Sequence, residues 1–317
     1  MKELIEAAHV ALTDCAAVRK GENVVIVTDE PLRRIGTAFW EAARALKADA
    51  IFCEIVSRKT HGEEPPRAVA ALLKVCDVFM IPTSKSLTHT DARRDACANG
   101  ARGATLPNIN EDMMKRTLRA DYKKIEERTR KVISLIEGAA EARVTTAKGT
   151  DITMSLAGRS CHEDTGIITE PGTSTNLPAG EAYLAPVEGT ARGRIVADGS
   201  CAGIGVLHEP IAIEVADGLA GDISGGGEAE KLIGLVSAFG RDARNIAELG
   251  IGTNDKAILS GSTLEDEKVM GTVHIALGDN VSMGGNVSVA SHLDLIIKSP
   301  TLIIDGREII KDGKLLV

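Results

Sequence analysis

The first 120 residues alternate continuous apolar runs with amphipathic segments. Buried strands are expected at NVVIVTD (23–29), AIFCEIV (50–56), DVFMIPT (77–83) and, shorter, ARGATLPN (101–108). Helices are expected over the first 18 residues, from residue 29 to about residue 47, after Pro65 and Pro66, and over 88–100. Apolar strands that are separated by amphipathic helices are typical of a parallel sheet with both faces covered.

A different pattern begins near residue 142, after a charged helix that is expected over 121–137. ARVTTAKGTDITMSLAG alternates polar and apolar residues around Gly149, which is typical of a hairpin. Short strands and glycine turns then dominate, apart from one helix expected from Glu228 to about Asn245. We therefore predict an α/β protein of two domains, an N-terminal α/β domain with a parallel sheet (1–140) and a C-terminal strand-rich α+β domain (141–317).

Composition and charge exclude several classes of partner. The 317 residues are 44% hydrophobic, which is enough for a sizeable core. A net charge of -8, from 37 basic and 45 acidic side chains, argues against nucleic acid, because binding it requires a basic face. Four Phe, two Tyr and one Trp offer few rings on which bases could stack. No apolar run reaches the roughly 18 residues of a membrane span, so we expect neither a nucleic-acid nor a membrane partner.

The N-terminus and the cysteines indicate a cytoplasmic protein. Glu3, Glu6 and Asp14 follow a helical rhythm, whereas a signal peptide has a basic start and an uninterrupted apolar core. The six cysteines include no CxxC pair, so neither a zinc knuckle nor a compact disulfide framework is expected. The chain also contains neither GxGxxG nor GxxxxGK[ST], which argues against a nucleotide site in the first half.

Five acidic or imidazole side chains of the second half lie in or beside apolar, strand-like runs. They are Glu181 in NLPAGEAYLAP, Glu248 in AELGIGTN, His274 in DEKVMGTVHIALGDN, and His292 and Asp294 in SHLDLII. Such side chains are costly in this setting unless they are paired or bind a metal. His292 and Asp294 are two residues apart, so in a strand they project from one face. Three carboxylates and two imidazoles suit one or two divalent ions of the Zn, Mn, Fe or Co kind, which makes 141–317 a predicted metal-binding domain.

The segments NLPAGEAYLAP, AELGIGTN, DEKVMGTVHIALG and HLD, in this order, resemble the signature of the aminopeptidase T-like metallopeptidases, a superfamily of leucyl aminopeptidases and thermophilic metalloproteases. In the first half the resemblance rests on SLTHTDARRDACANGARGATLPN. It implies a homodimer, an N-terminal α/β domain and a C-terminal domain with a dinuclear metal site. It also implies metal ligation by all five candidates: Glu181, Glu248, His274, His292 and Asp294.

One position departs from the peptidase pattern. The peptidases have a tyrosine seven residues after the HIALG histidine, where this chain has Val281. Valine can neither donate a hydrogen bond nor stabilise an oxyanion. The chain is also shorter than the peptidases, and both departures weigh against peptide hydrolysis.

The same superfamily includes 2,5-dihydroxypyridine dioxygenases, which carry one non-haem iron. The resemblance to them implies that His89 in SLTHTDAR acts as the base towards the ring hydroxyl. His89 could instead only cap or flank the helix that begins near Asp91. Against the dioxygenase, Glu248 keeps a carboxylate where those enzymes are expected to differ.

We therefore expect a metal-dependent hydrolase that resembles aminopeptidases, in which a metal-activated water attacks an amide or peptide bond. Its cofactor would be Zn, Co or Mn, one or two per chain. The first alternative is an Fe(II) ring-cleaving dioxygenase, and the second is a metal-binding protein with no catalytic role. The site is expected between the two domains, because such clefts favour small-molecule or peptide substrates.

Two cations are candidates for substrate binding, Arg93 and Lys268, although Lys268 could simply pair with Asp266 or Glu267. The dimer has modest physical support in the C-terminal segment LIIDGREIIKDGKLLV, an apolar hairpin whose edge would need covering. The alternative is that this hairpin packs on its own domain.

Overall fold

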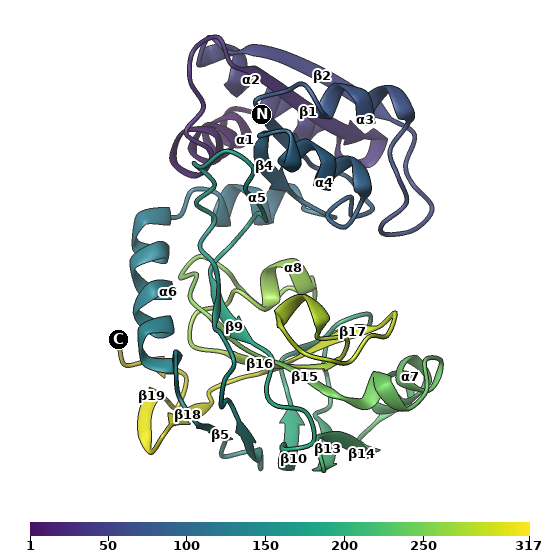
Figure 1. The fold of residues 1–317 in the computed structure, drawn as a ribbon, viewed down its shortest axis with the longest axis vertical. Coiled ribbons are helices and arrows are strands. Elements are labelled where there is room, and N and C mark those ends of the chain that lie inside the picture. Colours follow the sequence, from purple (N-terminus) through teal and green to yellow (C-terminus); the bar gives the residue numbers. More distant parts are fainter. The chain divides into compact units, whose positions relative to one another are not determined.

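The computed structural model describes residues 1–317, and they form two compact units that interleave along the chain (Figure 1). Unit 1 comprises Met1–Glu126 and Asp164–Ala179, and unit 2 comprises Glu127–Glu163 and Gly180–Val317. The chain thus passes between the units three times, whereas the sequence suggested a single boundary near residue 140.

Unit 1 is built on a five-stranded parallel sheet in the order β2-β1-β3-β4-β8. Its strands are β1 (Asn23–Asp29), β2 (Asp49–Ile55), β3 (Val78–Ile81), β4 (Arg102–Thr105) and β8 (Ser174–Asn176). Its helices are α1 (Lys2–Val10), α2 (Arg33–Ala45), α3 (Arg67–Leu73), α4 (Asp91–Ala98) and α5 (Glu111–Thr117). The fifth strand comes from the second half of the chain, and sequence analysis missed both it and α5.

Helices cover this sheet as the sequence predicted. Residues of α3 and α4 share a hydrophobic cluster with Val25, Val27 and Phe79 of the sheet. Helix α2 contacts β1 and β2 and packs against α1. It approaches β1 closely at Gly36, where a Cβ atom would lie 2.7 Å from the side chain of Thr28. The α/β class and the parallel sheet are confirmed.

Unit 2 consists mainly of two sheets. One has eight antiparallel strands in the order β14-β13-β10-β6-β5-β18-β19-β20, and the other has seven in the order β12-β11-β17-β16-β15-β9-β7. The first contains β5 (Glu141–Thr145), β6 (Asp151–Ser155), β10 (Arg192–Ala197), β13 (Ile211–Ala216), β14 (Leu219–Ser224), β18 (Thr301–Ile304), β19 (Arg307–Lys311) and β20 (Lys314–Leu315). The second contains β7 (His162–Asp164), β9 (Glu181–Leu184), β11 (Ser200–Cys201), β12 (Gly205–Val206), β15 (Ile246–Gly252), β16 (Val273–Gly278) and β17 (His292–Ile297).

A single hydrophobic core joins these sheets. It combines residues such as Val144 and Ile213 of the eight-stranded sheet with Ile275 and Leu295 of the seven-stranded sheet. Val132 of α6 (Tyr122–Ile136) also belongs to it, as do residues of α7 (Gly227–Ser237). The seven-stranded sheet therefore turns one face to a dry core and has its other face available for polar side chains.

The structure corrects the expected helix at 228–245. Helix α7 ends at Ser237, and Gly240 has a φ of 76°, a left-handed conformation that glycine adopts readily. A 3₁₀ turn, Arg241–Arg244, then leads into β15. Only Ala238 and Phe239 continue the apolar pattern between the end of α7 and this glycine.

The hairpin predicted at 142–158 is present as β5 and β6. The C-terminal segment adopts the alternative arrangement, in which it packs on its own unit: β18 pairs with β5, and β19 and β20 extend the same sheet. This packing leaves β20 at the edge of the eight-stranded sheet, and the homodimer stays a prediction.

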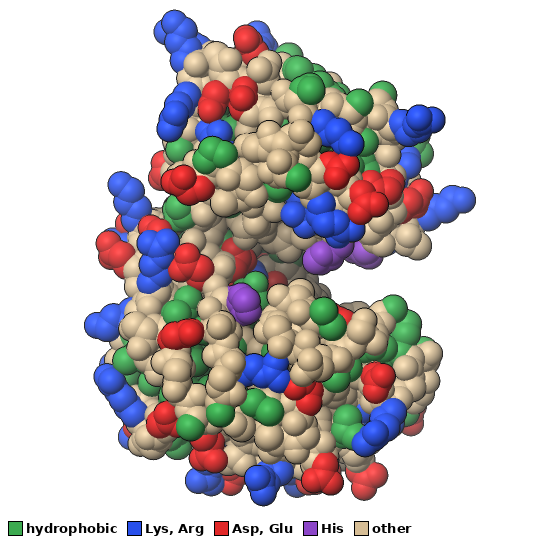
Figure 2. Space-filling model, viewed as in Figure 1, with side chains coloured by type: hydrophobic (Ala, Val, Ile, Leu, Met, Phe, Trp, Pro, Cys, Tyr) green, Lys and Arg blue, Asp and Glu red, His purple; other side chains and the backbone are tan.

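Basic and acidic side chains are interspersed on the face drawn in Figure 2, without a continuous basic patch. None of the helices combines the length and the apolar character that crossing a bilayer would require.

Candidate metal centre

Four adjacent strands of the seven-stranded sheet carry the five predicted ligands. Glu181 lies on β9, Glu248 on β15, His274 on β16, and His292 and Asp294 on β17. Side chains alternate between the two faces of a strand. On one face of these four strands, apolar side chains enter the hydrophobic core: Leu184, Leu249, Ile251, Ile275, Leu277, Leu295 and Ile297. The ligand candidates consequently share the opposite face of the sheet.

A β-bulge sets the direction of Glu248. Ile246 pairs with Leu277 and Glu248 pairs with Ala276, so β15 advances two residues while β16 advances one. Ala247 is the additional residue. If β15 paired regularly with Ala247 in place, Glu248 would share the face of Ile246, which belongs to the hydrophobic core. Sequence reasoning identified Glu248 but not the bulge that directs it.

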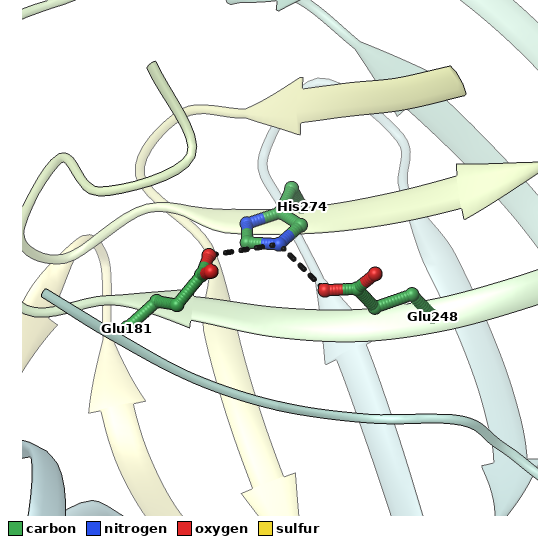
Figure 3. A group of neighbouring side chains, drawn as sticks. All are labelled: Glu181, Glu248 and His274. Atoms are coloured by element: carbon green, nitrogen blue, oxygen red, sulfur yellow. Dashed lines mark hydrogen bonds and ion pairs between the residues drawn. The ribbon is translucent and has the colours of Figure 1, made fainter. Parts of the chain in front are cut away.

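His274 is fully buried between two carboxylates (Figure 3). Its Nε2 atom lies 3.2 Å from Oε1 of Glu248 and 3.5 Å from Oε2 of Glu181. Gly250 is the partner of His274 in the β15–β16 pair and leaves room for the imidazole. The ring therefore has one position, pointing along the face towards both carboxylates.

His292 completes the other side of the cluster. Its Nε2 atom lies 3.0 Å from Oε2 of Glu248 and 3.5 Å from Oδ1 of Asp294. Its Nδ1 atom lies 2.8 Å from the carbonyl oxygen of Asp279, to which an Nδ1–H group donates. A hydrogen bond of this kind fixes the tautomer and the orientation of a metal-binding histidine.

Lys268 and Glu267 extend the cluster beyond the predicted set. Nζ of Lys268 pairs with Oε1 of Glu181 and lies 2.9 Å from Oε1 of Glu267. Both residues lie between α8 (Thr263–Asp266) and β16. Glu267 had been considered only as a partner of Lys268, yet it also forms a potential metal-holding group with His274 and Asp294. Its position in a turn gave no strand-like pattern that could have signalled this.

The electrostatics of the cluster favour a bound cation. Burial outweighs the charge of Lys268 and raises the pKa of Glu181 to about 8. Burial also opposes ionisation of Glu248, but hydrogen bonds from His274 and His292 outweigh it and hold the pKa of that carboxyl well below its usual range. Burial lowers the pKa of His274, but the hydrogen bond to Glu248 and the nearby carboxylates raise it to about 9. The carboxylates thus draw positive charge, here protons, towards the imidazoles.

The donor set fits a divalent metal ion. Three groups have ligand atoms within 4.8 Å of one another: Glu181, Glu248 and His274; Glu248, His292 and Asp294; Glu267, His274 and Asp294. In addition, Oε2 of Glu181 is buried and accepts no hydrogen bond. A buried carboxylate oxygen without a donor is costly, and a cation at this place would relieve the cost.

The predicted residues of the first half lie in unit 1. His89 is exposed in the loop before α4, and its neighbour Thr90 is the residue that caps this helix by accepting from the N–H of Arg93. The guanidinium of Arg93 donates to the carbonyl oxygen of Thr88 at 2.7 Å and to Oγ of Ser174 at 3.2 Å. Their catalytic and substrate-binding roles stay predictions, as does a site between the domains.

Position 281 offers no group for chemistry. Val281 begins a 3₁₀ turn, Val281–Met283, and half of its surface is exposed. An exposed valine cannot replace the hydroxyl that the peptidases have at this point of the chain.

Three comparisons relate this chain to known proteins. The chain is 24% identical over 196 residues to a 2,5-dihydroxypyridine 5,6-dioxygenase of Pseudomonas putida, an alignment that covers 57% of this chain and 55% of that protein. It thus spans about half the length of this curated relative. The solved 2,5-dihydroxypyridine dioxygenase of P. putida has a TM-score of 0.84 at 20% identity, covering 99% of this chain and 97% of that chain.

The aminopeptidase AmpT of Thermus thermophilus has a related fold. Its TM-score is 0.75 at 16% identity, covering 100% of this chain and 99% of that chain. At such identities the structural likeness concerns the fold alone. A family model, described as 2,5-dihydroxypyridine 5,6-dioxygenase, matches residues 3–317. Because this match extends over nearly the whole chain, the protein belongs to the 2,5-dihydroxypyridine 5,6-dioxygenase family.

Proposed function

We propose that the protein is an Fe(II)-dependent dioxygenase that cleaves the ring of a dihydroxypyridine or a closely related hydroxylated heterocycle. The observation that carries this proposal is the family match over residues 3–317. The site agrees with it, because two imidazoles and an aspartate on adjacent strands are the donor types of non-haem Fe(II) oxygenases. Sequence analysis had placed hydrolysis first, and the comparisons favour its alternative.

The protein side chains would hold and orient the reacting groups. His274, His292 and Asp294 would be the ligands, and the bound Fe(II) would supply redox chemistry and open positions for substrate and oxygen. The carbonyl of Asp279 holds the Nδ1–H group of His292, so that Nε2 points into the cluster. His89 would accept the proton of a ring hydroxyl, which makes the ring more electron-rich.

Metal-dependent hydrolysis is the second candidate, because Glu181 and Glu248 add two carboxylates to the His–His–Asp set. Carboxylates can bridge a pair of ions that activates water for attack on an amide. The valine at position 281 weighs against it. The third possibility, a non-catalytic metal-binding protein, would require a site that is closed to substrate.

Oxygen consumption distinguishes these functions. The chelator-treated protein is loaded anaerobically with one equivalent of Fe(II) and mixed with 2,5-dihydroxypyridine in air-saturated buffer. We expect oxygen uptake that matches the loss of the substrate absorbance, one molecule of O₂ for each ring cleaved. His274→Ala and Asp294→Ala should abolish both signals, and His208→Ala, an exposed histidine of the same unit, should retain them.

The same preparation, loaded with Zn(II), Co(II) or Mn(II), is offered an aminoacyl p-nitroanilide. Release of nitroaniline without any oxygen uptake on dihydroxypyridines would refute the dioxygenase and support the hydrolase. Tight metal binding without either activity would support the non-catalytic protein.

A further inference from the structure

A lysine side chain lies inside the metal cluster. The side chain of Lys268 is 2% exposed, and its ammonium pairs with Oε1 of Glu181 and with Oε1 of Glu267 at 2.9 Å. Burying an ammonium is costly unless carboxylates surround it. The ammonium of Lys268 therefore occupies a position between carboxylates that could otherwise bind a metal cation.

The two carboxylates that Lys268 engages come from different metal-holding groups. Glu181 belongs to the group with Glu248 and His274, and Glu267 belongs to the group with His274 and Asp294. A metal ion in either group would compete with the ammonium for the same carboxylate. The remaining group, Glu248, His292 and Asp294, contains neither of these two carboxylates.

We infer that Lys268 is a built-in substitute for a second metal ion and restricts the cluster to a single ion, held by His274, His292 and Asp294 beside Glu248. Nε2 of His274 lies 3.2 Å from Oε1 of Glu248, so His274 borders the group of Glu248, His292 and Asp294 and can bind the same ion. Glu181 and Glu267 serve to hold Lys268. The inference rests on the metal site of the proposed function, although it is independent of the substrate.

Charge balance supports a single ion. Four carboxylates surround the cluster: Glu181, Glu248, Glu267 and Asp294. When all four carboxylates are ionised, one divalent ion and the ammonium leave one negative charge, which the neighbouring imidazoles can accommodate. A second divalent ion would leave an excess of positive charge in a buried site and would lie close to the ammonium, where repulsion is strong because water is excluded.

The consequence is a restriction on chemistry. Two-metal hydrolysis places two ions about 3.5–4 Å apart around a shared water. An ammonium can neutralise carboxylates, but it has no acceptor orbitals with which to bind and activate water. Lys268 thus favours one-metal chemistry at a site whose carboxylates could otherwise hold two ions.

Metal stoichiometry tests the inference without any assay of activity. Chelator-treated wild type, Lys268→Met and Lys268→Arg are equilibrated with excess Mn(II), desalted, and analysed by elemental mass spectrometry. We expect about one ion per chain for wild type and Lys268→Arg, and about two for Lys268→Met. Electron paramagnetic resonance should show an isolated Mn(II) signal in wild type and a spin-coupled pair in Lys268→Met.

Two ions in wild type, or one ion in a folded Lys268→Met, would overturn the inference. Because Lys268→Met leaves buried carboxylates unpaired and its folding is at risk, Glu181→Gln provides a second test on a folded protein. It removes a partner of Lys268 but leaves the proposed ligands intact, so the single ion should persist with an affinity within a few-fold of wild type. Loss of that ion would contradict the assignment. Absence of ring cleavage in a protein with one ion would refute the proposed function and leave this inference standing.

Discussion

Gly250 and His274 are partners across the β15–β16 pair, and a Cβ atom on Gly250 would lie 1.9 Å from Nε2 of His274. This overlap cannot be relieved by a shift of a few tenths of an ångström. The glycine is therefore what allows the imidazole to lie flat along the sheet face, between Glu181 and Glu248.

Gly250→Ala should consequently displace the imidazole and weaken metal binding at least about tenfold, the lower end of the effect seen when the setting of a metal-binding histidine is disturbed. Isothermal titration with Zn(II) measures the change. Gly234→Ala is the control, because Gly234 lies in α7 with no atom within 4 Å of an added Cβ. Equal affinities for Gly250→Ala and wild type would show that His274 is not a ligand.

Metal content should depend on the ligands from the adjacent strands. We expect wild type purified without chelator to carry bound metal, and His274→Ala and Asp294→Ala to carry little, because each loses a ligand from a buried, electronegative cluster. Elemental analysis of the folded variants, checked by circular dichroism, provides the measurement. Unchanged metal content in both variants would refute a metal site in this cluster.

The metal-free protein should become less stable as the pH rises from about 6.5 to 9. The folded pKa of His274 is about 9 against an ordinary value of 6.5, and that of Glu181 is about 8 against 4.5. Both are raised, so the folded state holds these protons more tightly, and its advantage is lost as the pH rises through the folded pKa values. Metal binding should strengthen over the same range, because the ion displaces protons from the imidazoles.

Thermal melting of the chelator-treated protein at pH 6.5, 7.5 and 9 tests this dependence. The midpoint should fall with pH in the metal-free protein, and much less in the metal-loaded protein. His274→Gln, which cannot titrate, should flatten part of the fall. A metal-free protein that melts at the same temperature throughout would contradict the predicted proton linkage.

The role of His89 can be separated from that of the ligands. His89→Ala should retain its metal but lower kcat on a dihydroxypyridine by about 10²–10⁴-fold, the usual contribution of a general base. His9→Ala, an exposed histidine of α1, is the matched control and should behave as wild type. Undiminished turnover in His89→Ala would show that His89 is not the base and only flanks Thr90, the residue that caps α4.

Dimerisation rests on the family resemblance and remains open to a direct measurement. Light scattering of the purified protein should give about twice the 33.3 kDa mass of one chain over a range of concentrations. A mass that stays near that of one chain would refute the homodimer.

The sequence predicted most of the first unit because its strands are continuous apolar runs. It did not predict β8, since Ser174–Asn176 is short and polar and lies far along the chain from the strands it joins. Such a pairing depends on tertiary contacts that local patterning does not record. Helix α7 was predicted too long because Ala238 and Phe239 extend its apolar pattern, and the charged segment after Gly240 was taken for a further turn of the helix.

In the site, residue type identified the ligands but not their arrangement. Spacing placed His292 and Asp294 on one face, since a strand repeats every two residues. The pairing of Lys268 with Glu181 joins positions that are 87 residues apart in sequence, so no local pattern could indicate it. Gly250 in AELGIGTN was the one available signal, because glycine inside a strand often marks a close approach by another group.

The bulge at Ala247 gives β15 one residue more than its pairing with β16 requires. Deleting Ala247 would therefore leave a regular strand in which Ile246 and Glu248 still face opposite sides, whereas deleting Leu249 would turn either Glu248 or Gly250 to the wrong face. We expect the deletion at Ala247 to be tolerated better than the deletion at Leu249. A graft of this centre onto another sheet must keep the alternation of faces that places Glu248 opposite Ala276, and it can dispense with the extra residue itself.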